Sequence, residues 1–299
     1  MLAGEIRCLV DLRARVSECP LWDWERRALH FVDIYGGNIV TFDWSTGGLS
    51  SVSVGQPVGS IGLAGPERMI CGLQAGIALV DLATGALHRL ADIEHVRPDS
   101  RLNDGRCDPG GRFWVGSMKE SLDEPTGVLY RVDTDGSVTV QAEHIICSNG
   151  LAWSPDGRVM YHADSGQKTV WRYDYDVVSG TATNPRTFFT TPDGEGRPDG
   201  AAVDQEGCYW IARYDGWRIV RHAPDGSELF TLRTPVQHPT MCAFAGDDLS
   251  TLVFTSARGS LSEAELTAQP LAGSVFAVDV TVRGLKEPCF TLNAPAGAK

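Results

Sequence analysis

Six polar residues recur at one position of a repeated pattern, and side chains of these types could together bind a metal ion. In the four clearest copies, the polar residue stands five positions before the residue that begins the next turn. These four pairs are Glu18 with Asp23, Asn103 with Asp108, Asn149 with Ser154, and Asp199 with Asp204. The same offset selects Ser60 and Thr240 in two degenerate copies, so successive copies begin 42, 43, 46, 50 and 41 residues apart.

Two carboxylates and one amide oxygen from this set would form a hard-oxygen donor group. If Glu18, Asn149 and Asp199 converge, they suit one divalent ion such as Ca²⁺, Mg²⁺ or Mn²⁺, and they could also hold Zn²⁺ or Fe²⁺. Three protein ligands leave coordination positions for water and substrate, as a catalytic metal requires. Two plainer interpretations compete: Asn149-Gly150 and Asp199-Gly200 are common turn dipeptides, and a ring of polar groups can simply be hydrated.

Short strand-like segments make up most of the chain between these residues. Runs such as ALHFVDI, GIALVDL, GRFWVGSM and GSVFAVDV are rich in Val, Ile and aromatic residues and are bounded by turn formers. The best helical segment is LSEAELTAQ, near residue 265. Six copies of about 40 to 50 residues, each with three or four strands, predict an all-β fold, a six-bladed β-propeller that forms one domain over residues 1–299.

The two ends of the chain are predicted to share one blade. The last copy runs short of strands after GSVFAVDV, while EIRCLVDLR precedes the first copy, and joining them leaves no long unpaired edge. The first strand of each blade lines the central channel of a propeller, so the six polar residues would meet at one mouth of it. Strand alternation puts Arg101 on the same side as Asn103, where it could bind a substrate or pair with a carboxylate.

The composition and charge argue against several classes of protein. The chain has 299 residues, 42% of them hydrophobic, and a formal net charge of −12. Without clusters of Lys and Arg, this charge argues against nucleic acid or a membrane surface as a partner. Charged residues interrupt the N-terminal segment and no run approaches ~20 apolar residues, so we expect a cytoplasmic protein. The eight cysteines include no Cys-x-x-Cys pair and are expected to be buried free thiols.

Five stretches of the chain resemble, in order, a known family. They are SECPLWDWERRALHFVDI, RLNDGRCDPGGRFWVGSM, SNGLAWSPDGRVMYHADS, RPDGAAVDQEGCYWIARYDG and FTSARGSLSEAELTAQPLAGSVFAVD. The family is the regucalcin/gluconolactonase family, also called senescence marker protein, which includes sugar-acid lactonases and a luciferin-regenerating enzyme. The resemblance implies a six-bladed propeller with one divalent metal in the central channel, and hydrolysis of a sugar lactone.

The resemblance also implies roles for individual residues. The metal-binding Glu, Asn and Asp of the family correspond to Glu18, Asn149 and Asp199, and its substrate-contacting Arg and Asn correspond to Arg101 and Asn103. This chain departs from the family at two positions. Cys19 stands where some members carry Gly, and Ser121 stands where several members place a substrate-binding Glu. Glu120 is our candidate for that substrate-binding role, and Glu124 is the alternative.

These observations lead to the hypothesis of a metal-dependent lactonase acting on the aldonolactone of a pentose or hexose. The metal would polarise the lactone carbonyl and Asp199 would be the general base, with attack by hydroxide generated at the metal as the alternative. The acidic stretch DGEGRPDG near the channel mouth would disfavour a substrate with several negative charges. The rival hypotheses are a metal-dependent esterase or organophosphate hydrolase and a non-catalytic calcium-binding regulatory propeller.

Overall fold

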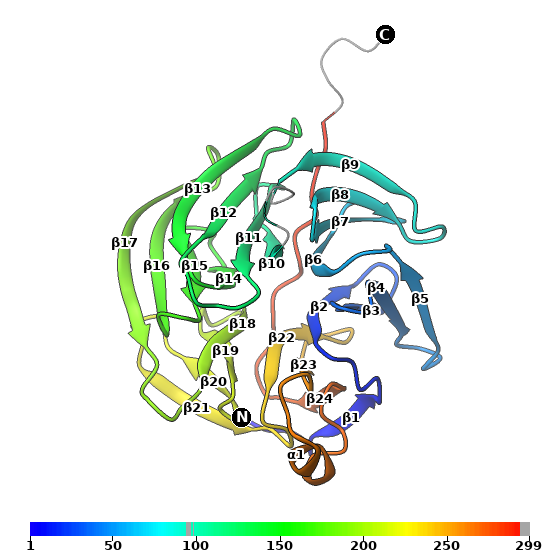
Figure 1. The fold of residues 1–299 in the computed structure, drawn as a ribbon. Coiled ribbons are helices and arrows are strands. Elements are labelled where there is room, and N and C mark those ends of the chain that lie inside the picture. The colour runs from blue at the N-terminus through cyan, green and yellow to red at the C-terminus, as the bar shows by residue number, and fades with distance from the viewer. Residues whose placement is uncertain (94–96, 98, 294–299) are drawn as a thin grey trace.

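Six four-stranded antiparallel sheets, which we call blades 1 to 6, surround a central channel (Figure 1). The computed structural model describes residues 1–93, 97 and 99–293. The domain predicted for residues 1–299 also includes residues 94–96, 98 and 294–299, which lie outside the described residues. The arrangement of the described strands in six four-stranded sheets confirms the predicted all-β, six-bladed propeller.

The strands of a blade follow one another along the chain, except in blade 6. Blade 1 contains β2 (Ser17–Asp23), β3 (Ala28–Asp33), β4 (Asn38–Asp43) and β5 (Leu49–Ser53). Blade 2 contains β6 (Val58–Leu63), β7 (Arg68–Leu73), β8 (Gly76–Asp81) and β9 (Leu87–Asp92). Blade 3 contains β10 (Ser100–Cys107), β11 (Phe113–Lys119), β12 (Gly127–Val132) and β13 (Val138–Ile145). Blade 4 contains β14 (Ser148–Trp153), β15 (Val159–Asp164), β16 (Thr169–Asp176) and β17 (Thr181–Thr190). Blade 5 contains β18 (Arg197–Val203), β19 (Tyr209–Tyr214), β20 (Arg218–His222) and β21 (Glu228–Arg233). Blade 6 contains β22 (Pro239–Ala245), β23 (Thr251–Ser256), β24 (Val275–Asp279) and β1 (Arg7–Val10).

Blade 6 closes the ring with strands from both ends of the chain. Its strand order is β1-β24-β23-β22, and Arg7 of β1 lies opposite Ala277 of β24. The predicted sharing of one blade by the two termini is confirmed. Helix α1 (Glu263–Ala268) lies between β23 and β24, at the predicted helical segment, and begins with a capping box formed by Ser262 and Glu265.

The innermost strands carry the six repeated polar residues. β2, β6, β10, β14, β18 and β22 each contact the inner strand of the next blade, so they form a continuous wall around the channel (Figure 1). The register between each inner strand and its neighbour shifts at or beside the polar residue, as between Glu18 and Leu21 in blade 1 and between Asn149 and Ala152 in blade 4. Such an irregularity of β-bulge type re-aims a side chain, which explains how the same position of several repeats can face the channel mouth.

The residue five positions after the channel-facing polar residue stabilises the turn that follows the inner strand. Asp204 is fully buried, and its side chain accepts hydrogen bonds from the backbone N–H groups of Glu206 and Cys208 at 2.9 and 3.0 Å. It also accepts from Trp210 Nε1 at 2.9 Å. Asp108 forms the equivalent bonds in blade 3, to the N–H of Gly110 and to Trp114 Nε1. The fixed spacing in the sequence therefore joins a channel residue to the residue that fixes the next turn.

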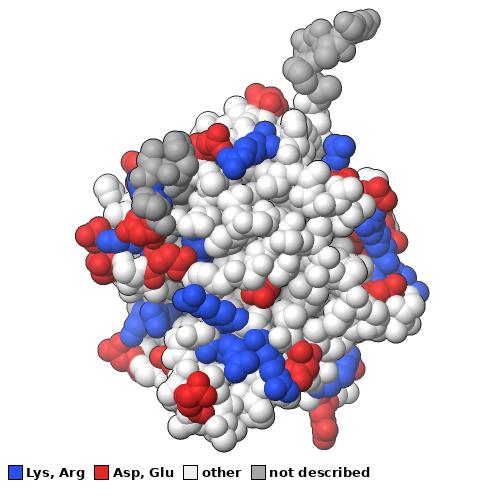
Figure 2. Space-filling model, turned by 45° about the vertical axis from the view of Figure 1, so that its right-hand side comes forward, with Lys and Arg blue, Asp and Glu red and all other residues white. Residues whose placement is uncertain are grey.

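The apolar core lies mainly between neighbouring blades. Val32 and Ile39 of blade 1, for example, pack in one cluster with Ile61 and Cys71 of blade 2. All eight cysteines are free thiols, and six of them are buried, whereas two are exposed, contrary to the expectation. On the face shown in Figure 2, acidic and basic side chains are mixed around the rim. No helix among the described residues is long and apolar enough to span a membrane.

Candidate metal-binding active site

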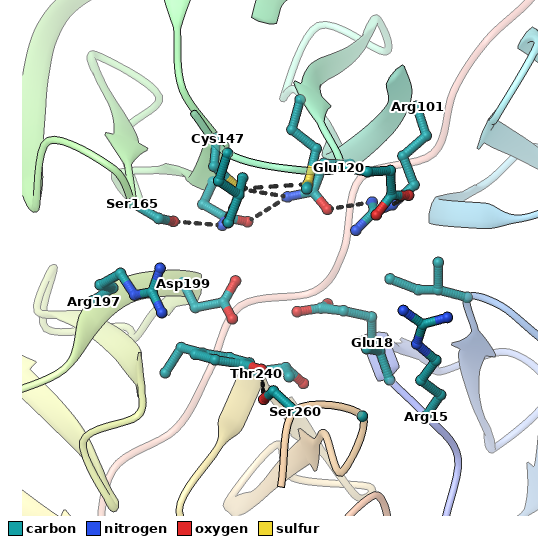
Figure 3. Close-up of a pocket in the computed structure, with 18 of the residues that line it drawn as sticks. Arg15, Glu18, Arg101, Glu120, Cys147, Ser165, Arg197, Asp199, Thr240 and Ser260 are labelled. Atoms are coloured by element: carbon teal, nitrogen blue, oxygen red, sulfur yellow. Dashed lines mark hydrogen bonds and ion pairs between the residues drawn. The ribbon is translucent and has the colours of Figure 1, made fainter. Parts of the chain in front are cut away.

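One cavity of about 330 Å³ at a mouth of the channel brings the predicted site residues together. Its lining includes all six of them: Glu18, Arg101, Asn103, Glu120, Asn149 and Asp199. Figure 3 shows the carboxyl groups of Glu18 and Asp199 pointing toward one another from opposite sides of the cavity. Residues separated by up to 181 positions in the chain thus converge. Glu18, Asn149 and Asp199 stand at the same place of different inner strands, as Asn103 does in blade 3. Arg101 precedes Asn103 by two residues, and Glu120 directly follows β11 of the same blade.

Glu18 and Asp199 are buried carboxyl groups that form no ion pair with any Arg, Lys or His among the residues that the structure describes. Glu18 is 8% exposed and Asp199 is 9% exposed. Burial raises the pKa of Glu18 well above its usual value, and the nearby Asp199 and Asp104 raise it further. Burial also raises the pKa of Asp199, with Asp104 adding to the effect, while Arg197 and Arg101 oppose it. Two desolvated carboxylates that repel one another are costly unless a cation lies between them.

Asn149 is held by a chain of hydrogen bonds that fixes the orientation of its amide. Its Nδ2 donates to Ser165 Oγ at 2.7 Å, and Ser165 Oγ donates to the carbonyl oxygen of Pro198 at 2.6 Å. Its Oδ1 accepts from Asn103 Nδ2 at 3.0 Å. Since the nitrogen is committed to Ser165, the second lone pair of Oδ1 is the part of this amide that can bind a cation.

Arg101 is positioned at the cavity wall by Glu120 and Tyr35. Arg101 Nε donates to Glu120 Oε1 at 2.9 Å, and Tyr35 Oη donates to Glu120 Oε2 at 2.6 Å. Arg101 Nη1 donates to Asn103 Oδ1 at 2.6 Å. Because Arg101 lines the cavity, its remaining guanidinium N–H groups can donate to a ligand. The alternative residue, Glu124, pairs with Lys119 at 3.1 Å and does not line the cavity.

The donor set fits a divalent cation. Glu18 and Asp199 supply carboxylate oxygens, Asn149 supplies an oriented amide oxygen, and each of the three side chains is at most 9% exposed. Among the described residues, no three His, Cys, Asp or Glu side chains gather as a metal site. The candidate ligands are therefore two carboxylates and an amide, which is a hard-oxygen set.

The predicted ring of six polar residues is incomplete. Thr240 lines the cavity, and its hydroxyl donates to the carbonyl oxygen of Ser17 at 2.7 Å. Ser60 does not line the cavity. Its hydroxyl is buried against Gly72 and Gly105, where an added Cβ would lie 2.8 and 2.6 Å from Oγ. Ser60 therefore packs between blades 2 and 3, because the neighbouring glycines leave room for it there.

Sequence reasoning missed several residues that line the cavity, among them Arg15, Tyr35, Ser165 and Arg197. Arg197 stands two positions before Asp199, as Arg101 stands two positions before Asn103. The alternation argument that selected Arg101 would have found Arg197 as well. Arg15, Tyr35 and Ser165 lie on loops, and the repeat gives no signal for them.

Cys19 occupies a backbone conformation that favours glycine. Its φ is +50°, and the φ of Gly150, which follows Asn149, is +67°. The N–H of Cys19 donates to Glu18 Oε2, and its thiol contacts the backbone N–H of Ile61 at 3.3 Å. These contacts across blades 1 and 2 offset the left-handed conformation, which explains how the chain accommodates a side chain at this position.

The opposite end of the channel is covered by the C-terminal segment, residues 281–293 (Figure 1). The N–H of Phe290 donates to the carbonyl oxygen of Leu63 at 2.7 Å, and Glu287 pairs with the buried Arg106 at 3.0 Å. A second cavity, of about 260 Å³, lies between this segment and blades 3 to 6. The candidate site therefore opens at the other mouth.

The acidic stretch DGEGRPDG contributes fewer free negative charges than its sequence suggests. Asp193 pairs with Lys168 at 2.6 Å, and Glu195 pairs with Arg218 at 3.7 Å. Neither acid lines the cavity, whereas Arg197 and Asp199 from the same stretch do.

A model of the SMP-30/Gluconolactonase/LRE-like region matches residues 16–258. The chain therefore belongs to the SMP-30/gluconolactonase/LRE-like family, as the sequence resemblance predicted. The match spans all six inner strands and every candidate metal ligand.

Individual relatives cover nearly the whole chain. The 6-deoxy-6-sulfogluconolactonase of Pseudomonas putida is 40% identical over 287 residues, which are 95% of this chain and 98% of that protein. Regucalcin of Xenopus laevis is 32% identical over 297 residues, 97% of this chain and 99% of that protein. Among solved structures, the calcium-binding protein regucalcin of Agrobacterium tumefaciens has a TM-score of 0.93 at 28% identity, over 97% of this chain and 98% of that one.

Proposed function

We propose that the protein is a metal-dependent lactonase that hydrolyses a sugar lactone to the sugar acid. The observation that carries this proposal is the convergence of Glu18, Asn149 and Asp199 with Arg101 in one cavity that opens at a single channel mouth. Membership in a family with sugar lactonases among its relatives supports the reaction class. The cavity volume is at the lower end of the range for small-molecule sites, about 300 to 1,000 Å³, and suits a monosaccharide derivative.

Glu18, Asn149 and Asp199 would hold one divalent ion. When bound, that ion supplies Lewis-acid polarisation of the lactone carbonyl. Its charge also offsets the repulsion between the two buried carboxylates, which lowers their pKa values toward the ionised state. Calcium is one candidate, since relatives include a regucalcin described as calcium-binding. Zinc, manganese, magnesium and iron are the others.

The chain's own residues would bind the substrate and move a proton. Asp199 accepts a proton from the attacking water while the water oxygen adds to the carbonyl carbon. The ring C–O bond then breaks, and the proton passes to the ring oxygen that leaves, so the products are a carboxylate and a hydroxyl group after release of one proton to solvent. Arg101 donates a guanidinium N–H to a substrate oxygen. Both amide hydrogens of Asn103 are directed at protein acceptors, so Asn103 orients Asn149 and offers Oδ1 to a substrate hydroxyl.

The polar lining favours the lactonase over the esterase hypothesis. Arg101, Asn103, Glu120, Thr240 and Ser260 all line the cavity and can form hydrogen bonds with sugar hydroxyls. A set of only three protein ligands favours a catalytic metal over a purely regulatory calcium site, because it leaves room for water and substrate.

Initial-rate hydrolysis of a lactone panel tests the proposal. The protein is stripped of metal, resupplied separately with Ca²⁺, Mg²⁺, Mn²⁺, Zn²⁺ or Fe²⁺, and assayed by proton release with spontaneous opening subtracted. The panel contains pentono- and hexonolactones together with a 6-sulfonated hexonolactone, because the Pseudomonas relative is named for such a compound. We expect metal-dependent turnover of at least one lactone. Metal binding without turnover of any lactone would contradict the proposal.

A further inference from the structure

With a divalent ion bound, the candidate site would contain more positive charge than its own carboxylates balance. Three arginines and three acids line the cavity. Glu120 pairs with Arg101, and Glu18 and Asp199 are the carboxylates assigned to the metal. A divalent ion balances those two carboxylates, which leaves Arg15 and Arg197. Neither arginine forms an ion pair with any acid among residues 1–93, 97 and 99–293.

The two remaining arginines lie in different surroundings. In Figure 3 they stand on opposite sides of the Glu18 and Asp199 carboxyl groups. Arg197 is two residues before Asp199, and its charge acts on that carboxylate. Arg15 lies at the exposed end of the cavity and, like Arg197, forms no ion pair with a described acid of the site.

Arg15 is positioned by specific contacts although it lies at the exposed mouth. Its guanidinium carbon is 4.0 Å from the centre of the Tyr35 ring, and the guanidinium carbon of Arg101 is 5.7 Å from the same centre. Its backbone oxygen accepts hydrogen bonds from the N–H groups of Arg258 and Gly259, both at 3.0 Å. A Cβ added to Gly259 would lie 2.6 Å from Arg15 Cγ, so the absence of a side chain there creates the space that Arg15 occupies.

We infer that Arg15, lying over Tyr35, binds an anionic group of the sulfonate or phosphate class on the end of the sugar lactone remote from its carbonyl. A guanidinium presents several N–H donors to such a group, and stacking on an aromatic ring orders those donors in advance. With the lactone carbonyl at the carboxylate pair, a substituent on the exocyclic carbon can extend past Glu18 toward Arg15. This inference rests on the proposed function and assigns the substrate class of the same site.

The inference reverses the expectation drawn from the acidic sequence stretch. The chain as a whole carries a net charge of −12, which repels a small anion at long range. Locally, Lys168 and Arg218 neutralise Asp193 and Glu195, while Arg15 and Arg197 face the cavity. Once a divalent ion is bound, the charges that line the site would sum to a positive value, opposite in sign to the net charge of the whole molecule.

A comparison of neutral and anionic substrates tests the inference. The substrates are glucono-1,5-lactone, its 6-phosphate and its 6-deoxy-6-sulfonate, and the measured quantity is kcat/KM with the metal that proves active. We expect Arg15→Gln to lower kcat/KM for an anionic lactone by about 10- to 100-fold and for the neutral lactone by no more than about 3-fold. Arg15→Lys should retain part of the preference. The two anionic substrates distinguish a sulfonate site from a phosphate site.

Two further variants control the experiment. Arg13→Gln removes the same charge two residues away, from an exposed arginine that pairs with Asp11 at 2.7 Å and does not line the cavity. It should change every rate by less than about 2-fold. Gly259→Ala displaces Arg15 without removing its charge and should reduce the preference for the anionic lactone. Equal losses on neutral and anionic lactones in Arg15→Gln would overturn the inference and leave the lactonase proposal standing.

A binding measurement separates the two proposals if no lactone is hydrolysed. Titration calorimetry with 6-phosphogluconate and with gluconate compares the wild type with Arg15→Gln. Tighter binding of the phosphorylated acid that is lost in Arg15→Gln supports the anionic subsite even without turnover. Equal binding of the two acids to the wild type overturns the inference.

Discussion

Two buried aspartates, five residues apart in blade 5, have opposite surroundings. Asp204, just after β18, accepts hydrogen bonds on both carboxylate oxygens, from two backbone N–H groups, Trp210 and Arg221. Asp199, within β18, has no side-chain donor among the described residues, and burial raises its pKa. One repeat unit thus places a fully satisfied carboxylate at the turn after the strand and a carboxylate without a described side-chain donor at the channel mouth. The difference indicates which end of each inner strand serves stability and which is available for binding.

The largest expected effect is on catalysis at the aspartate of the channel mouth. Asp199→Asn replaces a carboxylate ligand by a neutral amide and removes the proposed proton acceptor, and we expect kcat/KM to fall by about 10³-fold or more. The variant should remain folded, because no described side chain depends on Asp199 for a hydrogen bond. Initial rates and circular dichroism provide the measurement, and a variant that keeps full activity with metal bound would show that the assignment of the base is wrong.

The matching substitution at the satisfied aspartate should act on stability. Asp204→Asn replaces an acceptor that serves Trp210 and the buried Arg221, and we expect the free energy of unfolding to fall by roughly 3 kcal/mol. This value is at the low end of the range for breaking a buried ion pair. We choose the low end because Glu206 still pairs with Arg221 at 2.6 Å in the variant. Urea denaturation measures the loss. The activity of the folded fraction should stay near that of the wild type, and a selective loss of activity would break the comparison between the two aspartates.

The pH dependence of the metal-free protein should show the cost of burying the two carboxylates. Glu18 and Asp199 have pKa values raised by burial above their unfolded values of about 4.3 and 3.9. The unfolded chain therefore releases these protons at lower pH than the folded protein. The free energy of unfolding should fall as pH rises above about 4, until both folded groups have ionised.

A double variant isolates this contribution. The double variant Glu18→Gln with Asp199→Asn should lack this decrease in the free energy of unfolding with rising pH. The metal-free double variant should therefore be more stable than the metal-free wild type at neutral pH. Urea midpoints across the pH range, with a chelator present, give the difference between the two proteins. A difference that does not change with pH would show that these carboxyl groups are not the source of the effect.

The smallest expected effect concerns the support of the amide ligand. Ser165→Ala removes the acceptor that orients Asn149 Nδ2, and we expect the metal affinity to fall by about 10-fold, as for other residues that orient a ligand. Isothermal titration with the active metal measures the change. Ser179→Ala, an exposed serine hydroxyl on a distant turn of blade 4, is the matched control and should leave the affinity unchanged. Equal affinities in all three proteins would show that Ser165 does not position the ligand.

The sequence was sufficient to predict the propeller, the shared blade and six of the residues that line the cavity. It succeeded because Glu18, Asn149 and Asp199 occupy one position of a regular repeat, and a propeller converts equal positions in sequence into neighbouring positions in space. It did not predict the interior position of Ser60, which follows from the glycines around its side chain. Nor did it predict Arg15 or Tyr35, because loops between strands follow no repeat and their contacts are made across blades.

The joining of β1 to β24 has a consequence for how the chain folds. Arg7 of β1 contacts Asp279 of β24, 272 positions later in the chain, so β1 can find its partner only after the residues between them have been synthesised. The candidate metal ligands come from blades 1, 4 and 5, and they take up their final positions only when the ring has closed. Such long-range pairing predicts slow folding, with the edge of β24 exposed until β1 pairs with it. Metal that binds only the closed ring would favour it by mass action, so metal supply during synthesis would influence the yield of folded protein.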